Sequence, residues 1–137
     1  MTKESILELL PNGTMGIFST INENGVPDGR GWQFQFEEDG KFYFETNNTK
    51  DVYKEMMSNP NVAFTAMEPT GKYTIRITGK ATFITDPSKK EEAFVKLDKI
   101  VTGMYKSWDS PVLEIFYISS GELKLAKGFT PPEIINY

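Results

Sequence analysis

Two strings decide the fold of this chain: Arg30-Gly31-Trp32-Gln33-Phe34-Gln35-Phe36 and Glu45-Thr46-Asn47-Asn48-Thr49-Lys50. The first predicts a strand that begins at an arginine. The second predicts a strand that runs directly into a helix, whose first turn has unpaired N–H groups and a partial positive charge that favour anions. An arginine from the neighbouring strand and a lysine at the helix start would complete a phosphate pocket. We therefore predict a binding site for a phosphorylated small molecule.

Composition limits the class of protein. A chain of 137 residues is long enough for one domain with an enclosed core, and its ten Phe, six Tyr and two Trp favour a β-rich fold. Fifteen basic against nineteen acidic side chains give a net charge of −4, which disfavours a nucleic-acid partner because such binding needs a basic surface. No membrane-spanning run and no charged-then-apolar leader is visible. We expect a soluble, cytoplasmic protein with no membrane partner.

Cysteine and histidine are both absent. Their absence removes disulfides, thiolate nucleophiles, the commonest general base, the commonest transition-metal ligand and the usual axial ligand to haem. We predict no metal site and no catalytic side chain. Any chemistry near neutral pH would therefore belong to a bound cofactor.

Hydrophobic periodicity and turn residues predict a mainly β chain with a few short helices. We expect helices over 2–10, from Thr49 to Asn59 and from Asp86 to Gly103, with Thr2, Thr49 and Asp86 as N-caps. The predicted strands are 14–21, 28–37, 41–46, 62–68, 72–84, 111–119 and 123–127, with a bulge or bend at Gly79 and an irregular tail after Gly128.

The strand over 28–37 has two chemically different faces. One face carries Trp32, Phe34 and Phe36, which we predict to pack in the core. The other face carries Gln33 and Gln35, which we predict to form the wall of a site. Six or seven mostly sequential strands with short turns indicate a single antiparallel β-barrel with peripheral helices over 1–137. Closure of the barrel would remove exposed edges, and dimerisation could cover the rest.

The order of these elements resembles the FMN-binding split-barrel family, the group related to pyridoxamine 5′-phosphate oxidase and the nitroimidazole-resistance proteins. Together the matching segments span nearly the whole chain. They are 24–27, 30–36, 42–46, 47–50 with 52–54 behind it, 59–62, 76–81 and 113–117.

The resemblance implies a homodimer of antiparallel split barrels with one FMN per cleft at the subunit interface. It places Arg30 and Lys50 on the FMN phosphate, assisted by Thr49, and the backbone of Gly31, Trp32 and Gln33 along the isoalloxazine edge. Thr46 and Asn47 would contact the ribityl chain or the ring. Thr74 and Trp108 are candidates for a contribution from the second subunit.

The chain departs from the family pattern in two respects. Gly31 follows the arginine where the family often has proline, which loosens the backbone. The histidines linked with the oxidase and with the nitroimidazole-resistance group are missing, and the chain stops at Tyr137 without the oxidase's C-terminal extension. We therefore do not expect vitamin B6 oxidase activity.

Several functions stay open at this stage. The leading hypothesis is a flavin-dependent oxidoreductase that takes electrons from a small-molecule donor, NADH or NADPH, and passes them to a small acceptor. The alternative is a non-catalytic flavin store, carrier or redox sensor. A deazaflavin coenzyme, haem handling and a nucleic-acid-binding barrel are further alternatives, the last two disfavoured by the missing histidine and the negative charge. Arg30 could instead pair with one of the chain's own carboxylates.

Overall fold

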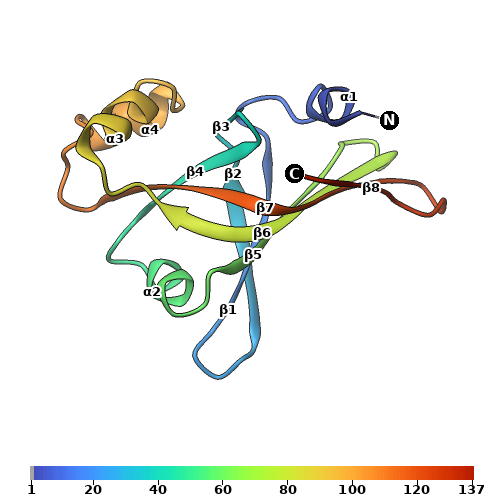
Figure 1. Cartoon of the computed structure of the whole chain (residues 1–137), viewed down its shortest axis with the longest axis horizontal. Helices are drawn as coiled ribbons and strands as arrows, with labels where there is room; N and C mark the ends of the chain where they lie inside the picture. The colour runs from blue at the N-terminus through green and yellow to red at the C-terminus, as the bar shows by residue number, and fades with distance from the viewer. Residues whose placement is uncertain (1) are drawn as a thin grey trace.

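The computed structural model describes residues 2–137, whose strands form one eight-stranded antiparallel sheet with helices at its margin (Figure 1). The strands are β1 (Met15–Ile21), β2 (Pro27–Gln33), β3 (Phe36–Glu38), β4 (Lys41–Asn47), β5 (Asn61–Met67), β6 (Tyr73–Phe83), β7 (Leu113–Lys127) and β8 (Glu133–Asn136). The helices are α1 (Lys3–Leu7), α2 (Asp51–Ser58), α3 (Pro87–Phe94) and α4 (Lys99–Tyr105).

The sheet curls into a barrel because its two end strands are consecutive in the chain. The strand order is β2-β1-β5-β6-β7-β4-β3, with β8 added to β7. The chain crosses from β2 to β3 at Phe34, which exchanges backbone hydrogen bonds with Gly13 (2.8 Å) and Thr14 (2.9 Å), and at Gln35, which donates to Tyr43 (3.1 Å). The predicted strand over 28–37 is therefore two strands joined by a corner.

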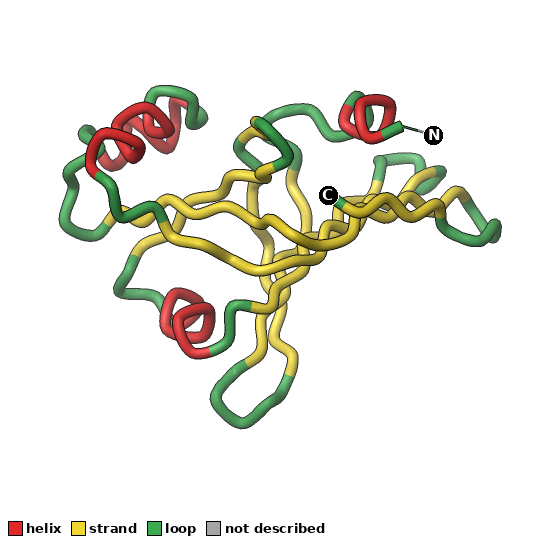
Figure 2. The backbone as a smooth tube through the Cα atoms, in the orientation of Figure 1, coloured by secondary structure: helices red, strands yellow, loops and turns green. Residues whose placement is uncertain are grey.

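The barrel is split beyond this corner. β3 pairs only with Lys41–Tyr43 of β4, so within residues 2–137 the rest of β4 pairs with β7 on one side and with no strand on the other. Among the same residues, β2 pairs only with β1. An unpaired strand edge presents free N–H and C=O groups. The predicted antiparallel split barrel is thus confirmed. Figure 2 shows α2 beside the β1–β2 hairpin, near the split.

A bulge shifts the register between the two longest strands, β6 and β7. Thr78 pairs with Glu122 and Lys80 with Ser119, so Gly79 alone lies opposite two residues of β7. The backbones approach so closely here that a Cβ on Gly121 would lie 1.7 Å from the Thr78 carbonyl oxygen. The bulge predicted at Gly79 is confirmed. The predicted break between two final strands is wrong, because β7 continues through the bulge as one strand.

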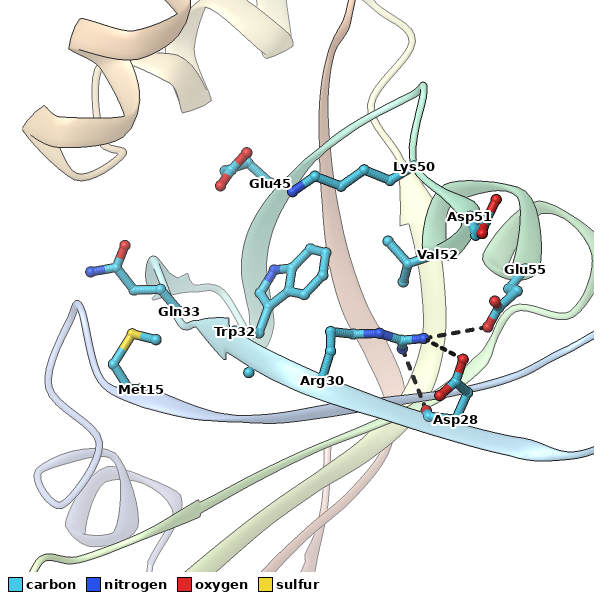
Figure 3. A pocket seen from close by; sticks show the side chains of 11 residues that line it. Met15, Asp28, Arg30, Trp32, Gln33, Glu45, Lys50, Asp51, Val52 and Glu55 are labelled. Atoms are coloured by element: carbon cyan, nitrogen blue, oxygen red, sulfur yellow. Dashed lines mark hydrogen bonds and ion pairs between the residues drawn. The ribbon is translucent and has the colours of Figure 1, made fainter.

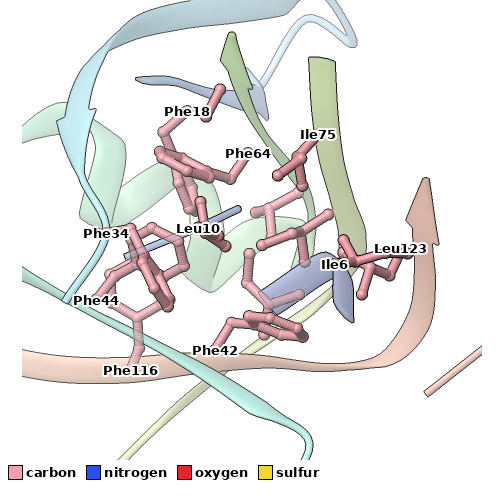
Figure 4. Packing of buried hydrophobic residues seen from close by; sticks show 14 of the residues in the cluster. Ile6, Leu10, Phe18, Phe34, Phe42, Phe44, Phe64, Ile75, Phe116 and Leu123 are labelled. Carbon is pink, nitrogen blue, oxygen red and sulfur yellow. The ribbon is translucent and has the colours of Figure 1, made fainter. Parts of the chain in front are cut away.

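Phenylalanines fill the barrel interior (Figure 4). Phe18, Phe44 and Phe116 are fully buried, with ring centroids 5.2–5.7 Å apart. α1 closes one end by burying Ile6. As predicted, Thr2 caps this helix, accepting a hydrogen bond from the Ser5 N–H at 3.2 Å. The helix predicted over 2–10 is shorter in the structure, where it ends at Leu7.

A second hydrophobic cluster lies outside the barrel under α3 and α4. Its buried members are Phe36, Ala93, Leu97, Val101, Leu113 and Ile115. Phe36 therefore does not share a core with Phe34, because the corner at residues 34–35 redirects the strand. The predicted single helix from Asp86 to Gly103 is wrong: Asp86 caps α3 as expected, but the chain turns and Asp98 caps α4.

The C-terminal tail is partly ordered, against expectation. β8 pairs with Glu122–Leu125 of β7. The Tyr137 hydroxyl donates to the Thr78 carbonyl at 2.9 Å, and its ring packs edge-on to Phe42. No helix within residues 2–137 is long and apolar enough to cross a membrane.

Candidate functional site

A cleft of about 470 Å³ opens where β2, β4 and α2 meet (Figure 3). Its lining residues are Met15, Asp28, Arg30, Gly31, Trp32, Gln33, Glu45, Lys50, Asp51, Val52 and Glu55. This volume lies within the range of sites that hold small ligands and cofactors. The lining carries two cationic and four anionic side chains, so the cleft shares the acidic balance of the whole chain.

Five of the predicted cofactor-binding residues come together in this cleft. β2 contributes Arg30, Gly31, Trp32 and Gln33, and the start of α2 contributes Lys50. Gly31 has no neighbouring atom within 4 Å of the position of a Cβ, so the backbone there is open to a ligand. The two strings that suggested a site do meet in space.

The Arg30 guanidinium is bound by oxygens of the protein itself. Nη1 donates to the Thr20 hydroxyl at 2.8 Å and to the Phe18 carbonyl at 3.2 Å. Nη2 lies 3.3 Å from a carboxylate oxygen of Asp28 and 3.4 Å from one of Glu55. The alternative that Arg30 pairs with carboxylates of its own chain is therefore what this structure shows. The cleft beside Arg30 nevertheless stays open.

Lys50 and Trp32 form the other cationic part of the cleft. The ammonium of Lys50 lies over the indole, 5.6 Å from the ring centroid, and none of the ion pairs within residues 2–137 involves it. Trp32 packs against Phe18 at 5.5 Å and is only partly buried. Lys50 is thus a cation held by an aromatic face and available to an anionic group.

Glu45 projects from β4 into the same part of the cleft (Figure 3). Burial raises the pKa of this carboxyl, while hydrogen bonding to Tyr105 and the charge of Lys50 oppose the shift. Burial, with the Glu45 charge second, raises the pKa of Tyr105 to about 12. The carboxyl of Glu45 can therefore hold a proton at higher pH than an exposed glutamate.

The other predicted residues lie outside this lining. Thr46 points into the barrel, 1% exposed, and its hydroxyl has no hydrogen-bond partner within residues 2–137. Asn47 accepts from the Thr49 N–H at 2.9 Å and from its hydroxyl at 2.7 Å. Thr49 as helix cap is wrong: the N-cap is Lys50, with no side-chain capping bond, because Asn47 engages the Thr49 hydroxyl. Thr74 and Trp108 do not line the cleft of their own chain.

The two glutamines of the predicted site wall have different surroundings. Gln33 lines the cleft. Gln35 is 2% exposed, and its Oε1 accepts a hydrogen bond from the Asp98 N–H at 2.9 Å, which fixes the start of α4. The interpretation of Gln35 as site wall is therefore wrong.

Sequence reasoning missed the acidic residues of the cleft. Asp51 and Glu55 are four residues apart, which places them on one face of α2, and that face turns toward β2. Asp28 lies two residues before Arg30 on the same strand and the same face. Both spacings were visible in the sequence, but neither marks a site until the strand and the helix are known to adjoin.

Comparisons with known proteins agree on a family and a fold. Residues 2–118 match the family model for pyridoxamine 5′-phosphate oxidase. A NimC/NimA family protein from Clostridium acetobutylicum has a similar structure, with 28% identity, a TM-score of 0.81, and coverage of 98% of this chain and 91% of that one. Among curated proteins, none matches this sequence.

Two more distant structures share the fold. A pyridoxamine 5′-phosphate oxidase-related, FMN-binding protein from Nostoc punctiforme is 15% identical with a TM-score of 0.75, covering 98% of this chain and 97% of that one. A haem-binding protein from Mycobacterium smegmatis is 10% identical with a TM-score of 0.76, covering 91% of this chain and 53% of that one. One fold therefore serves proteins with different cofactors.

Proposed function

Because this chain belongs to the pyridoxamine 5′-phosphate oxidase family, we propose that it is a flavoprotein that binds FMN in the cleft between β2, β4 and α2. The observation that carries the proposal is the convergence of Gly31, Trp32, Gln33 and Lys50 on one opening at the split of the barrel. Of the residues predicted as further contacts, Thr46 and Asn47 end β4, and Thr49 lies in the turn between β4 and α2.

The residues present suit a planar ring with an anionic tail. β2 is an edge strand, so its free N–H and C=O groups can meet the polar edge of an isoalloxazine ring. The partly buried indole of Trp32 offers an aromatic surface. Lys50, together with the N-terminus of α2, would hold the phosphate, and Arg30 would join them if its own carboxylate partners gave way.

We propose that the protein is an oxidoreductase acting on a small molecule. Bound FMN supplies the capacity to accept and pass on a hydride or single electrons. The chain contains neither histidine nor cysteine, so its part is to orient the ring, limit water and hold protons. The Glu45 carboxyl is the cleft residue whose raised pKa fits it to hold a proton near the ring.

A homodimer is part of the proposal. Met15, Ile17 and Met67 leave 51–66% of their surface exposed on the outer face of β1 and β5. Met15 also lines the cleft, so a second subunit on this face would lie next to the flavin. Such a subunit could contribute Thr74 or Trp108. Light scattering on the purified protein should give twice the monomer mass.

The visible absorption spectrum of the purified protein, before and after addition of FMN, tests the central claim. A flavin doublet that stays with the protein through gel filtration is expected. A protein that stays colourless after FMN addition would refute the proposal. If the protein binds a deazaflavin more tightly than FMN, the coenzyme is the deazaflavin and the proposal of FMN is wrong.

Turnover separates the enzyme from a flavin carrier or sensor. NADH or NADPH should reduce the bound flavin, and a small acceptor should reoxidise it. A flavin that no donor reduces would favour the non-catalytic alternative.

A further inference from the structure

Arg30, Thr20 and Glu55 form a closed ring of hydrogen bonds that joins three elements (Figure 3 shows Arg30 and Glu55). Nη1 of Arg30 donates to the Thr20 hydroxyl at 2.8 Å, and that hydroxyl donates to Oε1 of Glu55 at 2.7 Å. Nη2 of Arg30 completes the ring at 3.4 Å from the same oxygen. The ring lies mostly away from solvent, since Thr20 is 1% exposed and the Glu55 side chain 13%.

The ring and the neighbouring oxygens together occupy both terminal nitrogens of the guanidinium. Nη1 also faces the carbonyl oxygens of Phe18 and Asp28, and Nη2 also faces the Asp28 carboxylate. Among residues 2–137, no hydrogen bond uses Nε of Arg30. A phosphate could reach both terminal nitrogens of Arg30 only by taking the place of a carboxylate that is already there.

Resting on the proposed function, we propose that Glu55 is a resident anion on Arg30 that competes with the phosphate of the ligand. Glu55 would then determine how strongly the cleft prefers a phosphorylated flavin to an unphosphorylated one. Its place on α2, one helical turn after Asp51, puts its charge next to the helix start that would receive the same phosphate.

Geometry and charge favour competition over support. The contact of Glu55 with Arg30 is long, at 3.4 Å, whereas its bond from Thr20 is 2.7 Å, so the carboxylate is held mainly by the hydroxyl. A phosphate at Arg30 would add up to two negative charges close to Glu55 and Asp28. Repulsion between like charges a few ångströms apart in a partly buried site lowers affinity by roughly tenfold or more.

The test compares the dissociation constants of FMN and riboflavin, measured by flavin fluorescence, in the wild-type protein and in Glu55→Gln. Glutamine keeps the shape and the ability to accept from Thr20 but removes the charge. We expect Glu55→Gln to bind FMN about tenfold more tightly and riboflavin with unchanged affinity. Glu133→Gln, an exposed position on β8, makes the same change in net charge and should alter neither constant.

Opposite results overturn the inference. If Glu55→Gln binds FMN with unchanged or weaker affinity, Glu55 is a support for Arg30 rather than a competitor. If neither the wild type nor the variant binds either flavin, the proposed function is refuted together with this inference. If both bind FMN with equal affinity, only this inference is refuted. If Glu55→Gln does not fold, Glu55→Asp replaces it, because the shorter side chain moves the charge away from Nη2. Glu55→Asp should then lower the dissociation constant of FMN, by less than tenfold. An unchanged dissociation constant would overturn the inference.

Discussion

Thr20 offers a sharp test of the network around Arg30, because its hydroxyl is almost fully buried between two charged groups. Its side chain is 1% exposed, accepts from Arg30 at 2.8 Å and donates to Glu55 at 2.7 Å. Valine has nearly the same shape but no hydroxyl, so Thr20→Val removes both bonds without opening a cavity. We expect this variant to fold and to be clearly less stable than wild type.

The magnitude follows from the partners that remain. A hydrogen bond to a charged group contributes about 1.5–3 kcal/mol. After substitution Arg30 keeps the Phe18 carbonyl and Glu55 keeps the 3.4 Å contact with Arg30, and both side chains reach some solvent, so the two losses do not add in full. We expect Thr20→Val to lower the free energy of unfolding by about 2–3 kcal/mol. Thr20→Ser keeps the hydroxyl and loses one methyl group, which costs about 1 kcal/mol.

Urea denaturation followed by tryptophan fluorescence measures both variants. With a slope of about 2 kcal/mol/M, the Thr20→Val midpoint should fall by roughly 1–1.5 M and the Thr20→Ser midpoint by about half as much. The order of the two variants decides the matter. If Thr20 only filled space in the core, valine would be tolerated and serine would be the worse substitution, and that order would refute the reasoning.

Three further outcomes test the cleft and the C-terminus. Lys50→Ala should weaken FMN binding about tenfold and leave riboflavin unchanged in fluorescence titrations, because one charge-assisted contact to phosphate is lost; equal loss for both flavins would contradict the phosphate role. Burial raises the pKa of Glu45, so the folded state keeps its proton longer than the unfolded state and loses stability as the pH rises through that window. Glu45→Gln should therefore gain stability relative to wild type as the pH rises above the ordinary pKa of a glutamate, measured by urea denaturation at several pH values. A stability difference that does not change with pH would contradict the raised pKa. Tyr137→Ala should cost about 2–3 kcal/mol in the same melts, since it removes the bond to Thr78 and uncovers Phe42; a neutral change would show that the tail does not contribute to the core.

The barrel could be predicted because its strands are local and regular. Alternation of apolar residues, together with turns such as Asn22–Gly25, places most strands within a few residues of their bounds. Asn22 accepts from the N–H groups of Asn24 and Val26, and Gly25 takes a positive φ of 76°, as that turn requires. Such information lies within a few neighbouring residues and needs no knowledge of the tertiary structure.

Errors occurred where tertiary contacts override a continuous pattern. The aromatic alternation from Trp32 to Phe36 is unbroken, yet Phe34 enters the barrel and Phe36 enters the second cluster. The helical stripe from Ala93 to Val101 is equally continuous, but the chain turns before Asp98, whose N–H is bound by Gln35 from a distant segment. Periodicity cannot reveal a corner whose partners come from elsewhere in the chain.

The candidate site was predicted in its cationic half and missed in its anionic half. Arg30 and Lys50 were recognisable because a cation near a helix start suggests an anion. Asp28 and Glu55 were not, because acidic residues are common on any surface and their meaning depends on the approach of α2 to β2. Their contacts with Arg30 give the proposed phosphate site an anionic partner from within the chain.

β7 has a consequence for how the molecule comes apart. Leu113 and Ile115, near its start, belong to the cluster under α3 and α4. Farther along the strand, Phe116, Ile118, Leu123 and Leu125 belong to the barrel interior. Neither cluster can lose its order without disturbing a strand that the other also needs. We expect the two clusters to melt together in one cooperative transition, with the amide protons of β7 among the slowest in the molecule to exchange with solvent.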